Sequence, residues 1–265
     1  MGKVFVISNR KGGCGKSFTT ASLGVGLARL GKKVICIDTD NQHSLTVSLG
    51  VTEPDKLSVT LKTIISDIID EREIDPTAGI IHHAEGIDLM PANNSLTGIE
   101  LALATLIGRE TILRQYIEKV SPLYDYCLID TCPTLDMLTI NSLAAADNVI
   151  IPVTPKFLDA KGLELLLKSI AQIRRQINPQ LSICGILLTM VDKRTNFTKE
   201  IISMIEQAYG EQIHIFKNHV PHSVRAAETS ATGNSIFVHD PKGKVAAAYE
   251  ALAMSLLAYG GDGCE

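Results

Sequence analysis

The sequence has no tryptophan, and aromatic residues make up only 5% of its 265 positions. This scarcity argues against a row of exposed aromatic side chains on which single-stranded nucleic acid would stack. The six cysteines form no C-x-x-C pair, so neither a zinc site nor a disulfide framework is supported. No apolar run reaches the roughly 20 residues of a membrane-spanning helix, and no secretory signal precedes the strand-like residues 3–8. We therefore expect a cytoplasmic protein without a membrane partner.

The charge balance is slightly acidic, with 25 Lys and Arg against 29 Asp and Glu and a formal net charge of −4. The overall field therefore opposes nucleic acid, and any such contact requires a local basic patch. Hydrophobic residues make up 45% of the chain, which is enough for a sizeable core and fits one large α/β domain. We expect this single domain over residues 1–259, followed by a flexible tail at 260–265.

Short apolar runs alternate with longer helical patterns along the chain. Most of the runs lack polar alternation, as expected for strands that are buried on both faces of a sheet. Strands are predicted at 4–7, 34–37, 87–90, 127–129, 149–153 and 183–188. Helices are predicted at 17–30, 57–71, 97–120, 135–146, 160–177, 196–209 and 241–258. This alternation predicts an α/β fold with a mostly parallel central sheet flanked by helices on both faces.

The first predicted strand is followed by the segment Lys11-Gly12-Gly13-Cys14-Gly15-Lys16-Ser17, which opens the first predicted helix. Glycines let backbone N–H groups wrap phosphates closely, and a helix N-terminus adds a partial positive charge. A phosphate loop also needs a lysine that reaches the β- and γ-phosphates and a hydroxyl for Mg²⁺, and Lys16 and Ser17 occupy those positions. The alternative is an ordinary glycine-rich turn, but the strand before the segment and the helix after it favour the phosphate loop.

Acidic residues follow two of the predicted strands. Asp38 and Asp40 lie at the end of the second strand, and Asp130 ends the strand at 127–129. Ligands bind at the carboxyl ends of strands in such sheets, so these side chains are expected to face the phosphate loop. Asp130 has the form of a Walker B aspartate, which holds Mg²⁺, usually through water. A helix N-cap is the alternative role for a single aspartate at a strand end.

The phosphate loop departs from the usual G-x-x-x-x-G-K-[ST] spacing. Arg10 occupies the position of the first glycine, and Lys11 adds a second lysine. This K-G-G-x-G-K-[ST] form resembles the deviant Walker A family, which includes the ParA- and Soj-type partition ATPases and MinD. The resemblance covers nearly the whole chain and is closest to Soj-type proteins at 189–196, 220–228 and 240–244. It implies a P-loop NTPase fold with ATP and Mg²⁺ as cofactors, and the absence of a guanine-reading N-K-x-D pattern also favours adenine.

The resemblance implies roles for individual residues. Lys11 would reach the partner's nucleotide in an ATP-sandwich homodimer, although a solvated loop lysine is the alternative. Asp40 would orient the attacking water, and Asp38 would support the magnesium shell together with Ser17 and Asp130. The implied catalytic residues are Lys11, Lys16 and Asp40. The implied nucleotide contacts are Gly12, Gly13, Cys14, Gly15, Lys16, Ser17, Phe18 and Pro221.

Several positions differ from the family pattern. Phe18 stands where the family usually has Thr, and Asn41 and His43 replace the usual Pro and Gly after Asp40. Thr134 and Asp136 alter the second switch, which we define as residues 131–136. None of these changes removes a ligand named above. We expect a magnesium-dependent ATPase whose turnover is weak until a partner stimulates it.

In the Soj-like branch, arginines at the positions of Arg194 and Arg225 contact DNA without reading its sequence, and Lys242 and Lys244 are further candidates here. A few such charges suffice for phosphate contacts that weaken with salt. The alternative is that Arg194 pairs with Asp192 and Arg225 with Glu228. The resemblance implies DNA partitioning or segregation by an ATP homodimer in the cytoplasm, associated with the nucleoid. The implied partners are nonspecific double-stranded DNA and a ParB-like centromere-binding protein.

Another function remains open, namely that of a MinD-like positioning or regulatory ATPase that acts through a protein partner without DNA. MinD-type proteins dock on lipid through a basic amphipathic C-terminal helix. No Lys or Arg follows Lys244 in this sequence, which argues against membrane docking.

Overall fold

The computed structural model describes residues 2–259, with side chains throughout that range except at 157–161 and 259. The tail expected at 260–265 lies outside these residues. The described chain forms a seven-stranded sheet in the order β3-β4-β2-β5-β1-β6-β7. All neighbouring strands are parallel except β3, which runs antiparallel to β4. The strands are β1 (Lys3–Ile7), β2 (Val34–Asp38), β3 (Ile81–His82), β4 (Asp88–Met90), β5 (Tyr126–Asp130), β6 (Asn148–Val153) and β7 (Ser182–Leu188).

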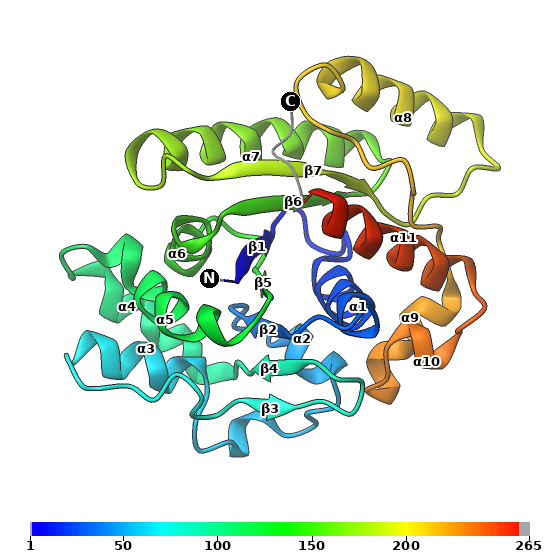
Figure 1. Cartoon of the computed structure of the whole chain (residues 1–265). Helices are drawn as coiled ribbons and strands as arrows, with labels where there is room; N and C mark the ends of the chain where they lie inside the picture. Colours follow the sequence, from blue (N-terminus) through cyan, green and yellow to red (C-terminus); the bar gives the residue numbers. More distant parts are fainter. Residues whose placement is uncertain (1, 260–265) are drawn as a thin grey trace.

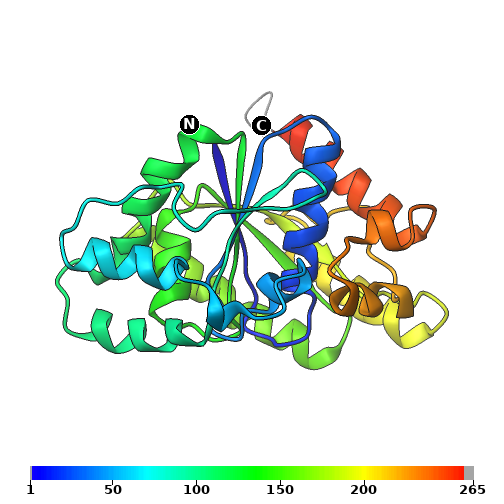
Figure 2. The same ribbon diagram turned by 90° about the horizontal axis from the view of Figure 1, so that it is seen from below.

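Helices cover both faces of this sheet, so the molecule has three layers (Figures 1 and 2). This architecture confirms the predicted α/β fold with a mostly parallel central sheet. One face packs against α3 (Leu61–Ile69), α4 (Thr97–Ala104), α5 (Ile112–Val120), α6 (Met137–Ala145), α7 (Phe157–Gln176) and α8 (Asn196–Tyr209). The other face packs against α1 (Lys16–Arg29), α2 (Ser44–Ser48), α9 (Val224–Thr232), α10 (Ile236–His239) and α11 (Lys244–Tyr259).

Alternate side chains of the interior strands point into two separate cores. In β1, Val4 and Val6 belong to the core beneath α3–α8, whereas Phe5 and Ile7 belong to the core beneath α1 and α11. Each of these four side chains is at most 3% exposed. Burial on both faces explains why the strand sequences are continuous apolar runs rather than alternating ones.

The prediction of one continuous helix over 97–120 is wrong. The helix α4 ends at Ala104, and α5 begins at Ile112 after a short 3-10 turn, η3 (Arg109–Thr111). Gly108, just before that turn, has a φ of 72°. Glycine adopts this left-handed conformation without steric cost, and it ends helical geometry.

Other short elements have no counterpart among the predicted ones, namely β3, α2, α9 and α10. Each is too short to show several turns of periodicity or a full apolar run. Among the described residues, none of the helices combines the length and the apolar character needed to cross a membrane.

Candidate nucleotide-binding site

Three neighbouring strands bring the predicted site together. The strands β2, β5 and β1 are adjacent, and Asp130 is in register with both Asp38 of β2 and Ile7 of β1. The loop that follows β1 therefore starts beside the two aspartates. This is the carboxyl edge of the sheet, where doubly wound folds bind their ligands.

The loop after β1 has the backbone shape that phosphate binding requires. Gly13 and Gly15 have φ values of 72° and 86°, in the region where a side chain would be strained. The helix α1 begins at Lys16 with no side-chain cap and no acidic residue in its first turn. An anion can therefore accept from the first N–H groups of this helix. Cys14 is buried, and its carbonyl accepts a hydrogen bond from Thr189 Oγ1 at 2.8 Å, which ties the loop to the end of β7.

The two lysines of the loop differ in exposure. Lys16 is only 7% exposed, and its Nζ donates to the carbonyl oxygen of Lys11 at 3.3 Å. The side chain of Lys16 therefore lies against the loop whose bound phosphates it is predicted to contact. Lys11 is exposed, so a second protein molecule can reach it.

Asp130 is fully buried, and its Oδ2 atom has no hydrogen-bond partner among the described residues. Thr20 Oγ1 donates a hydrogen bond to Oδ1 at 3.4 Å, and the hydroxyl of Ser17 lies near enough to lower the pKa of this carboxylate. Burial raises the pKa of Asp130 well above its ordinary range, and repulsion from Asp38 raises it further, whereas Ser17 and Lys16 lower it. A buried carboxylate oxygen without a donor is unfavourable unless a cation or water meets it.

The chemistry of this site suits Mg²⁺, a hard cation that prefers oxygen ligands and keeps several waters. The hydroxyl oxygen of Ser17 and Oδ2 of Asp130 are both possible oxygen ligands for a metal ion, and they belong to neighbouring side chains. Within the described part of the chain, no group of three or more His, Cys, Asp or Glu side chains could hold a metal by itself. That finding fits an ion that takes its remaining ligands from water and phosphate.

Asp38 organises the segment that follows β2. Its Oδ2 accepts hydrogen bonds from the N–H and the hydroxyl of Thr46, at 2.8 and 2.7 Å, and its Oδ1 accepts from the N–H of Asp40 at 3.1 Å. Burial raises the pKa of Asp38 to about 6, while the bonds from Thr46 lower it. Both oxygens thus already accept from the chain, so Asp38 holds Asp40 and Thr46 in position.

Asp40 lies in a tight turn and is 6% exposed. Its Oδ1 accepts from the N–H of Gln42 at 2.9 Å, and its carbonyl accepts from the N–H of His43 at 2.8 Å. His43 has a φ of 43° and precedes the first residue of α2. Two of the departures from the family pattern, Asn41 and His43, therefore belong to the turn that holds the predicted catalytic carboxylate.

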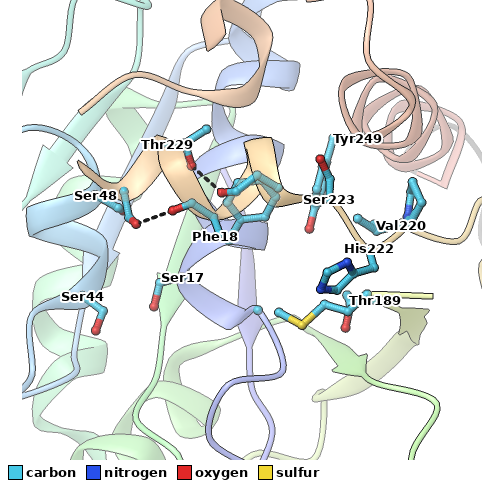
Figure 3. Close-up of a pocket in the computed structure, with 16 residues that line it drawn as sticks. Ser17, Phe18, Ser44, Ser48, Thr189, Val220, His222, Ser223, Thr229 and Tyr249 are labelled. Carbon is cyan, nitrogen blue, oxygen red and sulfur yellow. Dashed lines mark hydrogen bonds between the residues drawn. The ribbon is translucent and has the colours of Figure 1, made fainter. Parts of the chain in front are cut away.

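A cavity of about 360 Å³ opens beside the phosphate loop (Figure 3). It begins at Gly15 and Ser17 and extends between α1, α2 and α9. Phe18 and Tyr249 form an aromatic wall with ring centroids 5.5 Å apart and an interplanar angle of 72°. The hydroxyl of Tyr249 lies 2.9 Å from Thr19 Oγ1. Pro221, a predicted nucleotide contact, also lines this cavity.

Most of the cavity wall consists of residues for which the sequence predicted no contact with nucleotide. Met190 is the most informative of these residues, because its φ of 52° is rare for a residue with a side chain. Strained backbone conformations tend to cluster at functional sites. Seven of these residues lie in the segments that resemble Soj-type proteins, namely Thr189, Met190, Val220, His222, Ser223, Ala226 and Ala227. The others lie outside those segments and are Ser44, Ser48, Thr229, Ser230 and Tyr249.

The two predicted DNA-contacting arginines are exposed and ion-paired. Arg194 donates to both carboxylate oxygens of Asp192, at 2.8 and 2.6 Å, and these bonds lower the pKa of Asp192 to about 2. Arg225 Nη1 donates to Asp240 Oδ1 at 3.0 Å, so its partner is not the Glu228 of the alternative prediction. The two arginine side chains remain 89% and 64% exposed.

The basic candidates lie in two groups. Arg194 and Lys244 line one cavity of about 570 Å³ together with Lys193, His219 and His222. Arg225 and Lys242 are exposed but do not line it. Any contact of this acidic chain with DNA would require a local basic patch. Such a patch is centred on the loop after β7 and the start of α11.

Comparisons with known proteins show the family of this chain. A family model described as an AAA domain matches residues 2–183. Sporulation initiation inhibitor protein Soj of Bacillus subtilis is 36% identical over 98% of this chain and 100% of its own length. Chromosome partitioning protein ParA of Caulobacter vibrioides is 31% identical over 96% of this chain and 94% of its own length.

A solved structure is similar over the full chain. Cobyrinic acid a,c-diamide synthase from Mycobacterium smegmatis, with bound ATP analog and magnesium, is 31% identical with a TM-score of 0.85. The match covers 100% of this chain and 98% of that one. The chain therefore belongs to the AAA domain family and, within it, to the deviant Walker A partition ATPases of the ParA/Soj type.

Proposed function

We propose that this protein is a dimerising switch that uses ATP and Mg²⁺ to partition or segregate DNA. In this proposal residues 1–259 act as one ATPase domain, and the ATP-bound homodimer holds nonspecific double-stranded DNA until hydrolysis releases it. A ParB-like centromere-binding protein stimulates an otherwise weak ATPase. The protein is then cytoplasmic and associated with the nucleoid through its DNA contacts.

One observation carries the nucleotide part of the proposal. The buried Oδ2 of Asp130 has no hydrogen-bond partner among the described residues. Asp130 ends β5 beside Ser17, in the first turn of α1, whose first N–H groups have no side-chain cap. A triphosphate with its magnesium ion would meet both needs, because the phosphates accept from the N–H groups and the ion satisfies the carboxylate.

Residues of this chain then divide the work by position. Lys16 and the N–H groups of Gly12–Ser17 bind the phosphate tail, and Phe18 and Pro221 contact the nucleoside. Ser17 and Asp130 hold Mg²⁺, which when bound neutralises charge that develops on the phosphates. Asp40, supported by Asp38, orients the attacking water, and Lys11 reaches the nucleotide of the second protomer. Catalysis of this kind rests on positioning and electrostatics, with little covalent chemistry for the protein.

The proposed DNA surface consists of Arg194, Arg225, Lys242 and Lys244. Dimerisation doubles this set of charges on a chain whose net charge is −4. Contacts to phosphates alone give binding that is independent of sequence and falls steeply with salt. For DNA to bind, it must compete with Asp192 and Asp240 for the two arginines.

That competition favours a second candidate function. Because both arginines already have carboxylate partners within the chain, a positioning or regulatory ATPase that acts through a protein partner without DNA is the alternative. A gel shift on nonspecific duplex with ATP, at low and high salt, distinguishes the two functions.

The proposed function is tested by measuring ATP hydrolysis with and without duplex DNA, together with sizing by light scattering. We expect an ATP-dependent dimer that hydrolyses ATP only with Mg²⁺. Lys16→Ala should lose ATP binding, and Asp40→Ala should remain a dimer with ATP because hydrolysis no longer reverses it. Normal ATP affinity in Lys16→Ala, or a monomeric Asp40→Ala in ATP, would contradict the proposal.

A further inference from the structure

The start of α6 is held by a carboxylate that comes from another helix. Glu100 of α4 accepts hydrogen bonds from the backbone N–H groups of Met137 and Leu138, through Oε2 and Oε1 respectively, each at 3.1 Å. These are the first two residues of α6. The helix also has a local cap, because Asp136 Oδ1 accepts from the N–H of Thr139 at 2.8 Å. Glu100 therefore binds the two N–H groups that the local cap does not reach.

This contact is strong for its kind. A carboxylate that accepts from N–H groups forms charge-assisted hydrogen bonds. The positive end of the α6 dipole adds to them, because both N–H groups belong to the first turn. Glu100 is half-buried, so water screens these bonds only in part.

The helix α6 follows directly on the second switch, residues 131–136, which in turn follows Asp130. The hydroxyl of Thr139, in the first turn of α6, donates to the carbonyl of Thr134 in the second switch at 2.9 Å. The thiol of Cys132 lies 2.8 Å from Asp136 Oδ2, and Cys132 is 5% exposed. Hydrogen bonds therefore connect the second switch to the first turn of α6.

Further along, α6 contacts the catalytic edge of the sheet. Ser142 Oγ lies 3.3 Å from Thr39 Oγ1. The same Thr39 hydroxyl donates to the carbonyl of Asp130 at 2.6 Å, and Thr39 lies between Asp38 and Asp40. A shift of α6 would thus displace Thr39 and, with it, both the segment Asp38–Asp40 and the backbone of Asp130.

The outer face of α4 takes no part in these contacts. Leu101, next to Glu100, is 79% exposed, whereas Ile99 and Leu103 are buried in the core. Removal of the Glu100 carboxylate therefore leaves the hydrophobic anchoring of α4 intact. Leu101 provides a control on the same helix.

We propose that Glu100 is a positioning residue for ATP hydrolysis, which holds the first turn of α6 and with it the second switch in place beside Asp130. The inference rests on the proposed function in one respect, namely that the Asp130 edge hydrolyses ATP. Glu100 does not contact the phosphate loop. It therefore affects the rate of the chemical step and not the affinity for nucleotide.

The test compares Glu100→Ala and Glu100→Gln with Leu101→Ala in the full chain. Single-turnover hydrolysis of Mg²⁺-ATP should slow roughly tenfold in Glu100→Ala, the order of effect that a small misplacement of catalytic groups produces. Its Kd for ATP should stay within about twofold of wild type, because Glu100 contacts α6 and the phosphate loop leads into α1. Glu100→Gln should be intermediate, since its amide oxygen can accept only one of the two bonds, and Leu101→Ala should match wild type.

A second readout does not depend on ATP. Alkylation of the buried Cys132, followed by mass spectrometry of the peptide that contains it, reports how often the second switch opens. Labelling should be faster in Glu100→Ala, less so in Glu100→Gln, and unchanged in Leu101→Ala.

Two results would overturn the inference. One is wild-type hydrolysis and wild-type Cys132 labelling in Glu100→Ala. The other is a loss of ATP affinity in proportion to the loss of rate, which would make Glu100 a residue of general stability only. A wild-type protein that never hydrolyses ATP would instead refute the proposed function, and Cys132 labelling would still decide whether Glu100 holds the second switch.

Discussion

At the scale of single residues, the site contains two buried carboxylates in direct register. Asp38 and Asp130 lie opposite each other on β2 and β5, and neither has any exposed surface. Burial raises the pKa of both groups, that of Asp38 to about 6. The ordinary pKa of an aspartate is about 3.9. The folded state therefore holds these protons more tightly than the unfolded chain does.

This arrangement predicts how the nucleotide-free protein responds to pH. A raised pKa in the folded state favours folding fully below about pH 4, and this contribution is lost as pH rises through about 6 for Asp38. The melting temperature without Mg²⁺ should therefore fall between pH 4 and 7, as far as these groups determine it. Asp130→Asn, which cannot ionise, should melt above wild type at pH 7.5, by about 2–4 °C for each kcal/mol of stability gained.

The advantage of Asp130→Asn should shrink towards pH 4, where Asp130 is itself protonated. Differential scanning calorimetry without nucleotide measures both effects. A variant that melts below wild type at pH 7.5 would contradict this account. The same variant should lose Mg²⁺-dependent hydrolysis. The carboxylate that destabilises the nucleotide-free protein is also the one proposed to hold Mg²⁺.

Phe18 is the departure from the family pattern that lines the cavity. Its ring lines the cavity next to Ser17 and packs edge-on against Tyr249. We predict that Phe18→Ala weakens ATP binding about five- to tenfold, which corresponds to about 1 kcal/mol of aromatic contact. Binding of inorganic tripolyphosphate, which lacks the nucleoside, should not change.

Isothermal titration with both ligands checks this prediction. Phe197→Ala is the matched control, because Phe197 is an aromatic residue that is 58% exposed on α8 and does not line the cavity. Equal losses for ATP and tripolyphosphate in Phe18→Ala would show that the ring supports the phosphate loop and not the base.

At the scale of secondary-structure elements, the strands were predictable because each interior strand is buried on both faces. In a strand such as Val34–Asp38, the charged residue Asp38 stands only at the carboxyl end, so nothing interrupts the apolar run before it. The break between α4 and α5 was not predictable from periodicity, because leucines and isoleucines continue at helical spacing up to Gly108. Only the left-handed φ of that glycine, which the sequence permits but does not require, ends the helical path.

Two glycines in helices should respond in opposite ways to the same substitution. On α1, a Cβ atom added at Gly24 would lie 2.7 Å from the sulfur of the fully buried Cys36. Gly24→Ala should therefore destabilise the protein by about 1–3 kcal/mol despite the better helix propensity of alanine. On α4, nothing lies within 4 Å of a Cβ atom at Gly98, and Gly98→Ala should stabilise by up to about 1 kcal/mol.

Urea unfolding of the two variants beside wild type measures these changes. The prediction concerns their signs. If Gly24→Ala were as stable as wild type, the packing of α1 on β2 would be looser than these distances imply.

At the scale of the whole molecule, the site combines parts that sequence reveals with parts that it does not. The phosphate loop, Asp38 and Asp130 follow from local motifs, because each lies at the end of a recognisable strand. The cavity wall does not, because Ser48, Thr229 and Tyr249 come from α2, α9 and α11 and meet only through folding. The pairing of Arg225 with Asp240 likewise joins two segments that no local pattern connects.

The proposed DNA surface belongs to the scale of the proposed homodimer, and it is tested on the protein in the presence of ATP. Arg225→Glu should weaken binding of the ATP-bound dimer to nonspecific duplex roughly tenfold or more at low salt. Lys217→Glu, which makes the same change of charge at an exposed residue outside the proposed surface, should have little effect. Fluorescence anisotropy at several salt concentrations, with light scattering to confirm the dimer, gives both values. Equal losses in the two variants would indicate a general effect of charge and exclude a defined surface.

The position of β1 limits how this molecule can move. The strand lies inside the sheet, with β5 paired along one edge and β6 along the other, so the anchor of the phosphate loop cannot shift without breaking the backbone ladder on both sides. Deformation on loading or release of a ligand must then be taken up by the peripheral turns and short helices, while the central strands act as a fixed frame.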